Sequence, residues 1–346
     1  GWNWAVNARQ CGSAIKPVST YAPALDNGTI NGASVIDDYP MLLNGEVWPS
    51  NANWRYQGLT ALHTAIAQSL NTCAVRTNLA YGVSNSYDFL VDKLGFENLT
   101  YTDSQQVGNM ALGGFEKGVT TEEMSAAYAA FVNEGVYTKP RTFIRVEDAN
   151  GNVVLENEAQ STVAMKNTTA AIINHLLQEA ALNGTGYEAQ FSGMHIAGKT
   201  GSTNSNKDRY FVGYTPYYSC AVWAGYEHNQ RIVASGNPCS AVFRKVMSAI
   251  HADLPDKDFF SCSGLTSVAV CADSGMLASE NCALDVRGSR VYTALVAADN
   301  APTAVCTMHT APTYTVNMAD SDGNVTTVTG SVLNYQRELI EGHDEI

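Results

Sequence analysis

Apolar residues recur every three or four positions along several stretches of the chain, which is the spacing of a helix with one buried face. The clearest stretch covers residues 60–79, where Leu62, Ile66, Leu70, Ala74 and Val75 follow this spacing. Comparable spacing predicts further helices at residues 86–94, 121–133, 168–182 and 240–252.

Residues that favour helix ends mark several boundaries. Gly95 and Gly184 end the second and fourth of these helices, and Thr120 or Thr121 caps the third, with Glu123 three residues further on. In the last helix Val242, Val246 and Ile250 share one face. A further helix is expected to begin near Ser13, with Pro17 in its first turn.

The pattern changes after residue 190. Residues 194–197, 210–214 and 218–226 are rich in aromatic and β-branched residues and are separated by turn-forming stretches, which predicts neighbouring antiparallel strands. Residues 254–258 are expected to form a linker, and residues 259–346, rich in Thr, Val and Ala, a small β-rich unit. We therefore expect a main domain at residues 1–255 and a β-rich C-terminal extension at 256–346.

Composition narrows the functional classes. The net charge is −13, and the sequence has no stripe of basic residues that could neutralise phosphates. Both features argue against a nucleic-acid partner. No apolar run of about eighteen residues is present, so we expect no membrane span, and no segment has the pattern of a signal peptide. The chain opens with Gly-Trp-Asn-Trp and no Met, which we interpret as a fragment or a processed product.

The eight cysteines fall into two groups. Four are scattered, and we expect them to be buried free thiols: Cys11, Cys73, Cys220 and Cys239. Four lie in the last third: Cys262, Cys271, Cys282 and Cys306. Their spacing lacks Cys-x-x-Cys pairs, so a structural zinc site is a poor match, and two disulfides are predicted there if the compartment is oxidising. Three pairings are possible, and the sequence does not choose between them.

The first chemical motif is Ser13 followed three residues later by Lys16. At a helix start, this spacing puts both side chains on one face. A neutral lysine amine can take the proton of a serine hydroxyl when its pKa is lowered by burial or a nearby cation. The amide of Ser13 can help to hold an oxyanion. The pattern alone is expected about once by chance in a chain of this length, as a capped helix with an exposed lysine.

The second motif is Ser69-Leu70-Asn71, on the polar side of the helix expected at residues 60–79. Ser69 is placed to pass a proton between Lys16 and a leaving amine, and Asn71 to orient Lys16 and to bind a substrate carbonyl. The competing interpretation is a polar kink or a helix boundary.

The third motif is Lys199-Thr200-Gly201-Ser202, after the strand expected at 194–197. Lysine supplies charge for a carboxylate, the two hydroxyls supply hydrogen bonds, and glycine lets the backbone approach closely. The amide of Ser202 would be the second oxyanion donor. A strand running into a glycine turn, with a solvated lysine, is the alternative. A given Lys-Thr-Gly triplet is expected less than about one time in ten by chance.

The order and surroundings of these motifs resemble those of the class A (bifunctional) penicillin-binding proteins, roughly from residue 9 to residue 309. Cys11 stands where that family usually has proline, and Ser202 where threonine is commoner. The segments that carry the resemblance are Arg-Gln-Cys-Gly-Ser-Ala-Ile-Lys-Pro at 9–17, Asn-Ala-Asn-Trp-Arg-Tyr-Gln-Gly at 51–58, Ala-Ile-Ala-Gln-Ser-Leu-Asn-Thr at 65–72, Ala-Leu-Gly-Gly at 111–114, Gly-Val-Thr at 118–120, Glu-Met at 123–124, Gly-Lys-Thr-Gly-Ser-Thr-Asn at 198–204, Asp208, Phe-Val-Gly-Tyr-Thr-Pro at 211–216, Cys-Ala-Asp-Ser-Gly at 271–275, and Cys306 with His309.

The resemblance implies an α/β (α+β) fold of the penicillin-binding and serine β-lactamase-like type, with an antiparallel sheet flanked by helices, an all-helical subdomain and the β-rich extension. In that family sheet strands precede the nucleophile, after a glycosyltransferase domain and a membrane anchor. Residues 1–12 are too few for these strands, so we expect an N-terminally truncated domain with an incomplete sheet.

The resemblance also implies a serine D,D-transpeptidase that cross-links peptidoglycan stem peptides at the extracytoplasmic face of the bacterial membrane, where an anchor in the parent chain would hold it. Its partners would be stem peptides and the β-lactams that mimic them, with no metal or organic cofactor. Ser13 would be the acylated nucleophile and Lys16 its base, and Ser69 and Asn71 would form the relay. Lys199, Thr200, Gly201 and Ser202 would hold the substrate carboxylate.

Two alternatives remain open. A serine β-lactamase shares the three motifs but also needs a base that activates water, and no convincing glutamate motif lies between Asn71 and Lys199. Glu122 and Glu123 suit the first turn of a helix better. A non-catalytic β-lactam sensor, or a scaffold that binds stem peptides, is the other alternative.

Overall fold

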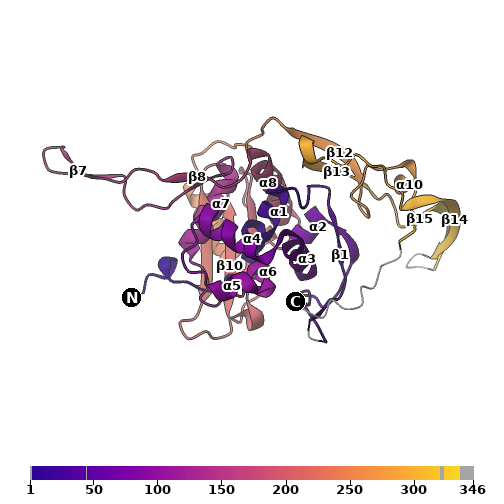
Figure 1. Cartoon of the computed structure of the whole chain (residues 1–346), viewed down its shortest axis with the longest axis horizontal. Coiled ribbons are helices and arrows are strands. Elements are labelled where there is room, and N and C mark those ends of the chain that lie inside the picture. The colour runs from indigo at the N-terminus through magenta and orange to yellow at the C-terminus, as the bar shows by residue number, and fades with distance from the viewer. Residues whose placement is uncertain (1, 44, 320–322, 336–346) are drawn as a thin grey trace.

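A computed structural model describes residues 2–43, 45–319 and 323–335. Figure 1 shows a central body from which two parts project in opposite directions. One is the hairpin of β6 (Arg145–Glu147) and β7 (Val153–Glu156), and the other contains strands β12 to β15. No helix in the described part of the chain is long and apolar enough to cross a membrane.

The central sheet has three antiparallel strands in the order β11-β10-β9. They are β9 (Ala197–Ser202), β10 (Asp208–Tyr214) and β11 (Ser219–Gly225). The two aromatic-rich strands are thus confirmed as neighbours, but the expected strand at 194–197 is wrong because β9 begins only at Ala197. The strand is formed by the Lys-Thr-Gly motif itself, which pairs along its whole length with β10 despite the absence of aromatic residues.

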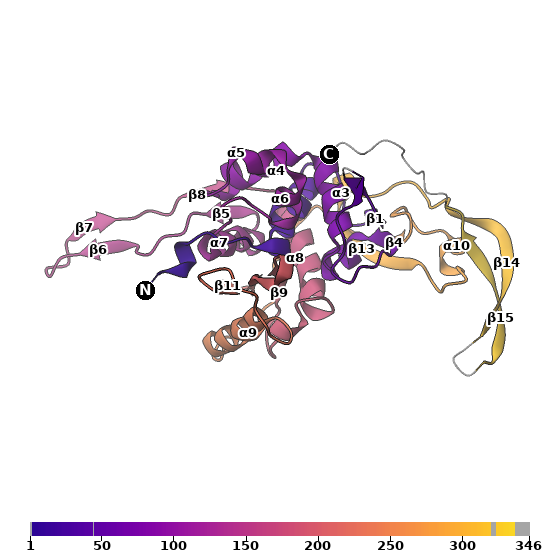
Figure 2. The same ribbon diagram turned by 90° about the horizontal axis from the view of Figure 1, so that it is seen from below.

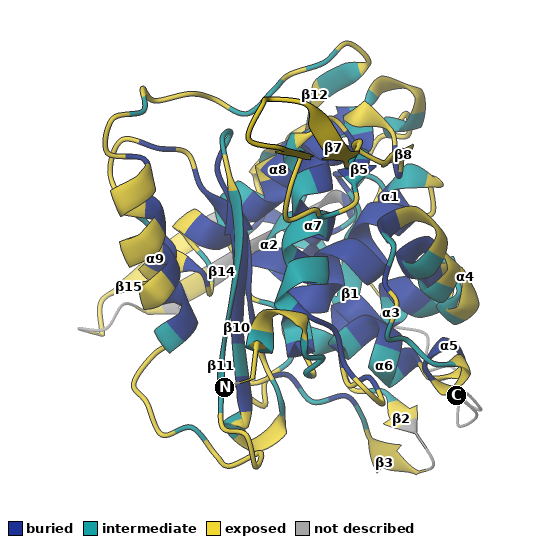
Figure 3. Cartoon of the chain, turned by 90° about the vertical axis from the view of Figure 1, so that its left-hand side faces the viewer, coloured by how far each residue is buried: buried dark blue, intermediate teal, exposed yellow. Residues whose placement is uncertain are grey.

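Helices cover both faces of this sheet, as Figure 3 shows. Side chains alternate along β10: Tyr210, Val212 and Tyr214 pack in the main core with α7 (Thr121–Val132) and α8 (Asn167–Leu182). Phe211 points the other way, into a smaller core with α9 (Pro238–Ile250). Because the side chains on both faces of β10 are apolar, the strand is buried between two layers of helices.

Three of the predicted helices form close to their expected bounds. In α7, Thr120 caps the helix and forms a reciprocal capping box with Glu123. The helix expected at 86–94 forms as α4 (Val83–Asp88), which continues as π-helix η4 (Phe89–Lys93). In α9 the buried residues include Phe243 and Met247, whereas the face of Val242, Val246 and Ile250 is about half exposed. The apolar spacing therefore located this helix but did not identify its buried face.

The helix expected over 60–79 is interrupted, and this prediction is corrected. Strand β4 (Gly58–Ala61) leads into α2 (Leu62–Ala67), and a new helix, α3 (Asn71–Tyr81), begins after a break at 68–70. The break contains Ser69 with a φ of 59°. Strand β1 (Val35–Asp38) pairs with β4, and the chain also forms helices α1 (Ala22–Asp26), α5 (Tyr101–Gln105) and α6 (Val107–Leu112).

The extension is β-rich, as expected. Figure 2 shows β12 (Leu265–Cys271) and β13 (Val291–Ala297) beside the body, with the long ribbon of β14 (His309–Ala319) and β15 (Val325–Leu333) beyond them. The remaining elements are β2 (Leu42–Leu43), β3 (Glu46–Val47), β5 (Val136–Thr138), β8 (Ser161–Val163), α10 (Glu280–Ala283) and the 3₁₀ helices η1 (Trp4–Val6), η5 (Tyr187–Ala189), η6 (Asn204–Asn206) and η7 (Ala298–Asn300).

The predicted disulfides are absent: all eight cysteines are free thiols. Three of the four C-terminal cysteines do gather in one place, but a histidine joins them there, and Cys262 lies outside the group. Among the scattered cysteines Cys11, Cys73 and Cys239 are buried, as expected, and Cys220 is partly exposed.

Candidate active site

The segment that carries Ser13 is held by close backbone packing. It begins with 3₁₀ helix η2 (Gly12–Ile15) and continues as π-helix η3 (Pro17–Tyr21), so a helical start near Ser13 is confirmed. Gly12 has a φ of 55°, and a Cβ atom there would overlap the backbone of Ser202 in β9. Gly113, which ends α6, packs equally closely on Gly12. Glycine therefore lets two other elements reach the nucleophile segment.

Lys16 lies at the end of η2 and is fully buried. Its Nζ donates to Asn71 Oδ1 at 2.7 Å and to the Ser69 carbonyl oxygen at 2.8 Å. Ser69 Oγ and the Leu70 carbonyl oxygen each lie 3.4 Å from it. Burial, with a smaller contribution from the charge of Lys199, holds the pKa of Lys16 well below its usual range. A neutral amine in this position can accept a proton.

Ser69 and Asn71 reach Lys16 because the chain breaks between α2 and α3. The left-handed backbone at Ser69 turns both its carbonyl and its hydroxyl towards the amine. Asn71 is the first residue of α3. On an unbroken helix the side chains of Ser69 and Asn71, two residues apart, would have pointed in different directions. The boundary between α2 and α3 therefore lets both residues contact Lys16.

A second layer of polar residues holds Asn71. Its backbone N–H donates to Asn51 Oδ1 at 2.8 Å, and its Nδ2 donates to the Ser50 carbonyl oxygen at 2.7 Å. Asn51 in turn donates to Asp38 Oδ1 at 2.8 Å, where the hydroxyl of Thr72 also donates. Asn51 lies in one of the segments that carry the resemblance, but neither it nor Asp38 was predicted from the sequence to have a role in the site. The only sequence feature that pointed to Asn51 was its position just before a turn that contains Trp54.

Strand β9 places the third motif against the nucleophile segment. A Cβ atom on Gly201 would overlap the carbonyl oxygen of Cys11, so the two backbones touch there. Thr200 shares a hydrogen bond of 2.7 Å with Thr185. Ser202 lies at the exposed end of the strand, where Arg209 donates to its Oγ at 3.3 Å. The motif thus forms one wall of the site rather than a turn after a strand.

Lys199 is 1% exposed, and its Nζ donates to the Thr200 carbonyl oxygen at 3.3 Å. Burial lowers its pKa from 10.5 to about 7. The interpretation of this residue as a solvated lysine is therefore wrong. Below about pH 7 the ammonium form of Lys199 gives this strand a positive charge that suits a carboxylate.

Side chains outside the motifs hold the chain on either side of Ser13. Arg9 Nε pairs with Asp208 Oδ1 at 2.9 Å, and Trp223 Nε1 donates to the same oxygen at 3.0 Å. The hydroxyl of Tyr128 donates to the Ala14 carbonyl oxygen at 2.7 Å in the buried core. These contacts join Arg9, just before η2, to β10 and join Ala14 in η2 to α7, while Trp223 of β11 supports the Arg9–Asp208 pair.

The arrangement brings the backbone of η2, which carries Ser13, together with a buried amine, a second hydroxyl with an amide, and a lysine-bearing strand. Among the described residues, both groups of side chains close enough to hold a metal lie in the extension, away from this site. The fold and the site define a class: the serine penicillin-binding and β-lactamase-like proteins, which activate serine with lysine.

Comparison with known proteins gives the family within that class. The chain belongs to the penicillin-binding protein transpeptidase family, because residues 3–248 match the model of the penicillin-binding protein transpeptidase domain. Residues 261–311 match the model of the C-terminal domain of penicillin-binding protein 1A. The resemblance found in the sequence is thereby confirmed.

Curated relatives and solved structures agree with this assignment. Penicillin-binding protein 1A of Clostridium perfringens is 35% identical over 332 residues, which are 91% of this chain and 39% of that protein. Penicillin-binding protein 1A/1B of Bacillus subtilis is 33% identical over 73% of this chain and 29% of its own length. The chain thus spans well under half of these relatives.

The predicted fold class is confirmed by the solved structures. The crystal structure of penicillin-binding protein 1A from Haemophilus influenzae superposes with a TM-score of 0.74 at 22% identity, over 88% of this chain and 50% of that one. The imipenem acyl-enzyme complex of penicillin-binding protein A from Mycobacterium tuberculosis gives a TM-score of 0.60 at 18% identity, over 72% of this chain and 62% of that one.

Proposed function

We propose that this chain is the acylating part of a serine D,D-transpeptidase that cross-links peptidoglycan. The observation that carries the proposal is Lys16, a buried amine whose pKa is lowered and which is hydrogen-bonded to both Ser69 and Asn71. In the proposed domain organisation, residues 1–255 form the transpeptidase unit and residues 256–346 the extension.

In the proposed reaction the Ser13 oxygen attacks the carbonyl carbon of the penultimate D-alanine of a stem peptide, and Lys16 takes the hydroxyl proton. The amides of Ser13 and Ser202 hold the oxyanion. The peptide bond breaks, and D-alanine leaves with a proton delivered through Ser69. An amine of a second strand then attacks the ester and releases Ser13; water in place of the amine gives carboxypeptidase activity.

Lys199, Thr200 and Ser202 are proposed to bind the terminal carboxylate, with Gly201 allowing the close approach of the substrate backbone. Asn71 would bind a substrate amide. β-Lactams would acylate Ser13 because they present a carboxylate and a reactive carbonyl in the same arrangement. An acyl-enzyme with imipenem, of the kind named for the Mycobacterium tuberculosis protein, is the species we expect here. The parent protein would act at the extracytoplasmic face of the membrane.

The experiment is labelling with a fluorescent penicillin followed by a timed chase. We expect covalent label on the wild type that persists for many minutes, none on Ser13→Ala, and unchanged label on the exposed control Ser248→Ala. A stem-peptide mimic should release D-alanine. Rapid loss of label would indicate a β-lactamase, and stable label without D-alanine release a sensor; either result contradicts the proposal.

The structure favours the transpeptidase over the β-lactamase at one position. Both carboxylate oxygens of Glu123 are engaged: one accepts from the Thr120 N–H at 2.7 Å, and the other accepts from the Glu97 N–H at 2.8 Å. This glutamate caps its helix, as the sequence suggested, and is not presented as a base for water.

A further inference from the structure

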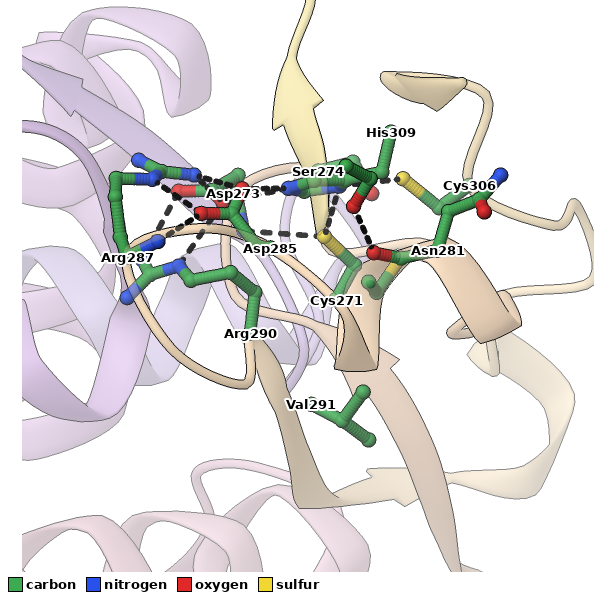
Figure 4. A network of polar contacts seen from close by, with 12 residues as sticks. Cys271, Asp273, Ser274, Asn281, Asp285, Arg287, Arg290, Val291, Cys306 and His309 are labelled. Carbon is green, nitrogen blue, oxygen red and sulfur yellow. Dashed lines mark hydrogen bonds and ion pairs between the residues drawn. The ribbon is translucent and has the colours of Figure 1, made fainter. Parts of the chain in front are cut away.

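Four side chains in the extension converge from different elements. Cys271 ends β12, Cys282 lies in α10, Cys306 precedes β14 and His309 begins it. All four are buried, with exposed fractions of at most 5%. Their three sulfurs and one ring nitrogen all lie within 4.8 Å of one another. Figure 4 shows Cys271, Cys306 and His309 facing one another at the centre of this group.

The spacing of these atoms is that of a tetrahedral metal site. Nδ1 of His309 lies 3.5 Å from Cys271 Sγ and 3.6 Å from Cys306 Sγ. A tetrahedral Zn²⁺ with bonds of about 2.3 Å to sulfur and about 2.0 Å to nitrogen places such atoms about 3.5 Å apart. The nitrogen of His309 and the sulfurs of Cys271 and Cys306 therefore already have the spacing that such an ion requires, and Cys282 Sγ lies within 4.8 Å of all three.

The surroundings of the sulfurs suit thiolates. The backbone N–H of Asp273 donates to Cys271 Sγ at 3.4 Å, and the backbone N–H of Ser279 donates to Cys282 Sγ at 3.4 Å. Such bonds stabilise negative charge on sulfur. Three buried thiolates also need a compensating positive charge, which a divalent cation would supply.

The other nitrogen of the histidine is held by carboxylates. Nε2 of His309 lies 2.9 Å from Asp285 Oδ2 and 3.2 Å from Asp273 Oδ2. A carboxylate behind a metal-binding histidine fixes the orientation of the ring and leaves the opposite nitrogen free to bind. The same pairing directs Nδ1 towards the three sulfurs.

The two aspartates are themselves neutralised. Arg287 pairs with Asp273 at 2.7 Å and with Asp285 at 2.9 Å, and Arg290 pairs with Asp273 at 2.9 Å. A cation placed between these carboxylates would face two guanidinium groups. The sulfur side of His309 is therefore where the metal belongs, and the aspartate side is its support.

We propose that Cys271, Cys282, Cys306 and His309 bind one structural Zn²⁺ ion. Three sulfurs and one imidazole nitrogen form a donor set that selects zinc over calcium or magnesium. Four protein ligands close the coordination sphere, so the site is structural rather than catalytic. The ion would join β12, α10 and β14, whose shared apolar cluster is small. This proposal is independent of the proposed transpeptidase activity.

The first experiment measures metal content in the chain purified without chelators. We expect about one zinc ion per chain by mass spectrometry of the metal, falling to a small fraction in Cys306→Ala and His309→Ala. The matched control is Cys262→Ala, which removes a thiol from the same extension but outside the cluster and should leave the zinc content unchanged. The variant His309→Cys supplies a fourth sulfur and should retain metal.

A second measurement needs no variant. Replacement of the zinc by Co²⁺ should give the visible absorption of a tetrahedral cobalt–thiolate centre, and removal by a chelator should lower the melting temperature of the extension. A wild-type protein without zinc, iron in its place, or non-reducing peptide maps with a disulfide among Cys271, Cys282 and Cys306 would each overturn the proposal. Equal zinc in wild type and in correctly folded Cys306→Ala would do so too.

Discussion

If Lys199 binds the substrate carboxylate as proposed, its charge state should make acylation depend on pH, and this dependence can be measured separately from the rest of the reaction. Burial lowers the pKa of this lysine to about 7, so its ammonium is present below that pH and is lost as the pH rises through it. At pH 8 about one tenth of the free protein carries the charge, and at pH 9 about one hundredth. Binding of a substrate carboxylate should weaken in proportion.

The perturbation is Lys199→Arg, because a guanidinium stays charged throughout this range. The second-order rate constant of acylation by a fluorescent penicillin is measured for both proteins between about pH 6 and about pH 9. Burial, the main cause of the lowered pKa of Lys16, is the same in both proteins, so the ratio of variant to wild type reports mainly the charge at position 199, including its smaller effect on Lys16. We expect this ratio to rise about tenfold per pH unit above pH 7, although arginine's different shape lowers its absolute value.

A ratio that stays constant from pH 6 to pH 9 would refute the reasoning, because Lys199 would then keep its charge in spite of its burial. The conservative control Lys207→Arg alters an exposed lysine near the same strand and should give a ratio near one at every pH.

Other contacts in the site give further expected outcomes. Asn71→Ala removes the hydrogen bond that Lys16 Nζ donates to Asn71 and should slow acylation about 10-fold to 100-fold by the same assay, with little change in unfolding by urea; an unchanged rate would contradict the positioning role. Gly201→Ala drives a Cβ atom into the Cys11 carbonyl and should destabilise the fold by about 1–3 kcal/mol or more, seen as a lower urea midpoint. Tyr128→Phe leaves the buried Ala14 carbonyl without this donor and should cost about 1–3 kcal/mol in the same measurement; a loss below about 0.5 kcal/mol would count against it.

The sequence predicted the elements whose signals are local. Helix α7 carries its own cap in Thr120 and Glu123, and β10 and β11 are recognisable from their aromatic and β-branched residues. The three motifs could also be recognised from the sequence, because residue types at a fixed spacing indicate a kind of chemistry even when the fold is not known.

Features that depend on tertiary contacts were missed. The break at Ser69 follows from packing of α2 and α3 on different neighbours, while their apolar spacing continues across it. Strand β9 is a strand because β10 pairs with it, and its Lys-Thr-Gly residues have little strand preference of their own. Helix α9 shows two apolar faces in the sequence, and only the structure distinguishes the buried one.

The cysteines show how a local rule can mislead. The number of cysteines alone predicts disulfides, whereas Cys306 and His309 form a Cys-x-x-His pair, which is also a metal-binding pattern and contains only one cysteine. The partners Cys271 and Cys282 lie on other elements, so nothing in their spacing reports that they meet.

The glycine contacts between η2, α6 and β9 have a consequence for how this protein can vary. Gly12, Gly113 and Gly201 meet backbone directly, so any side chain there would push η2, α6 and β9 apart. Sequence changes are therefore easier to accommodate in the side chains around these glycines, such as those that contact Asn71 and Thr200. The backbone contacts at these three glycines set fixed positions for η2, α6 and β9, while the neighbouring side chains can change.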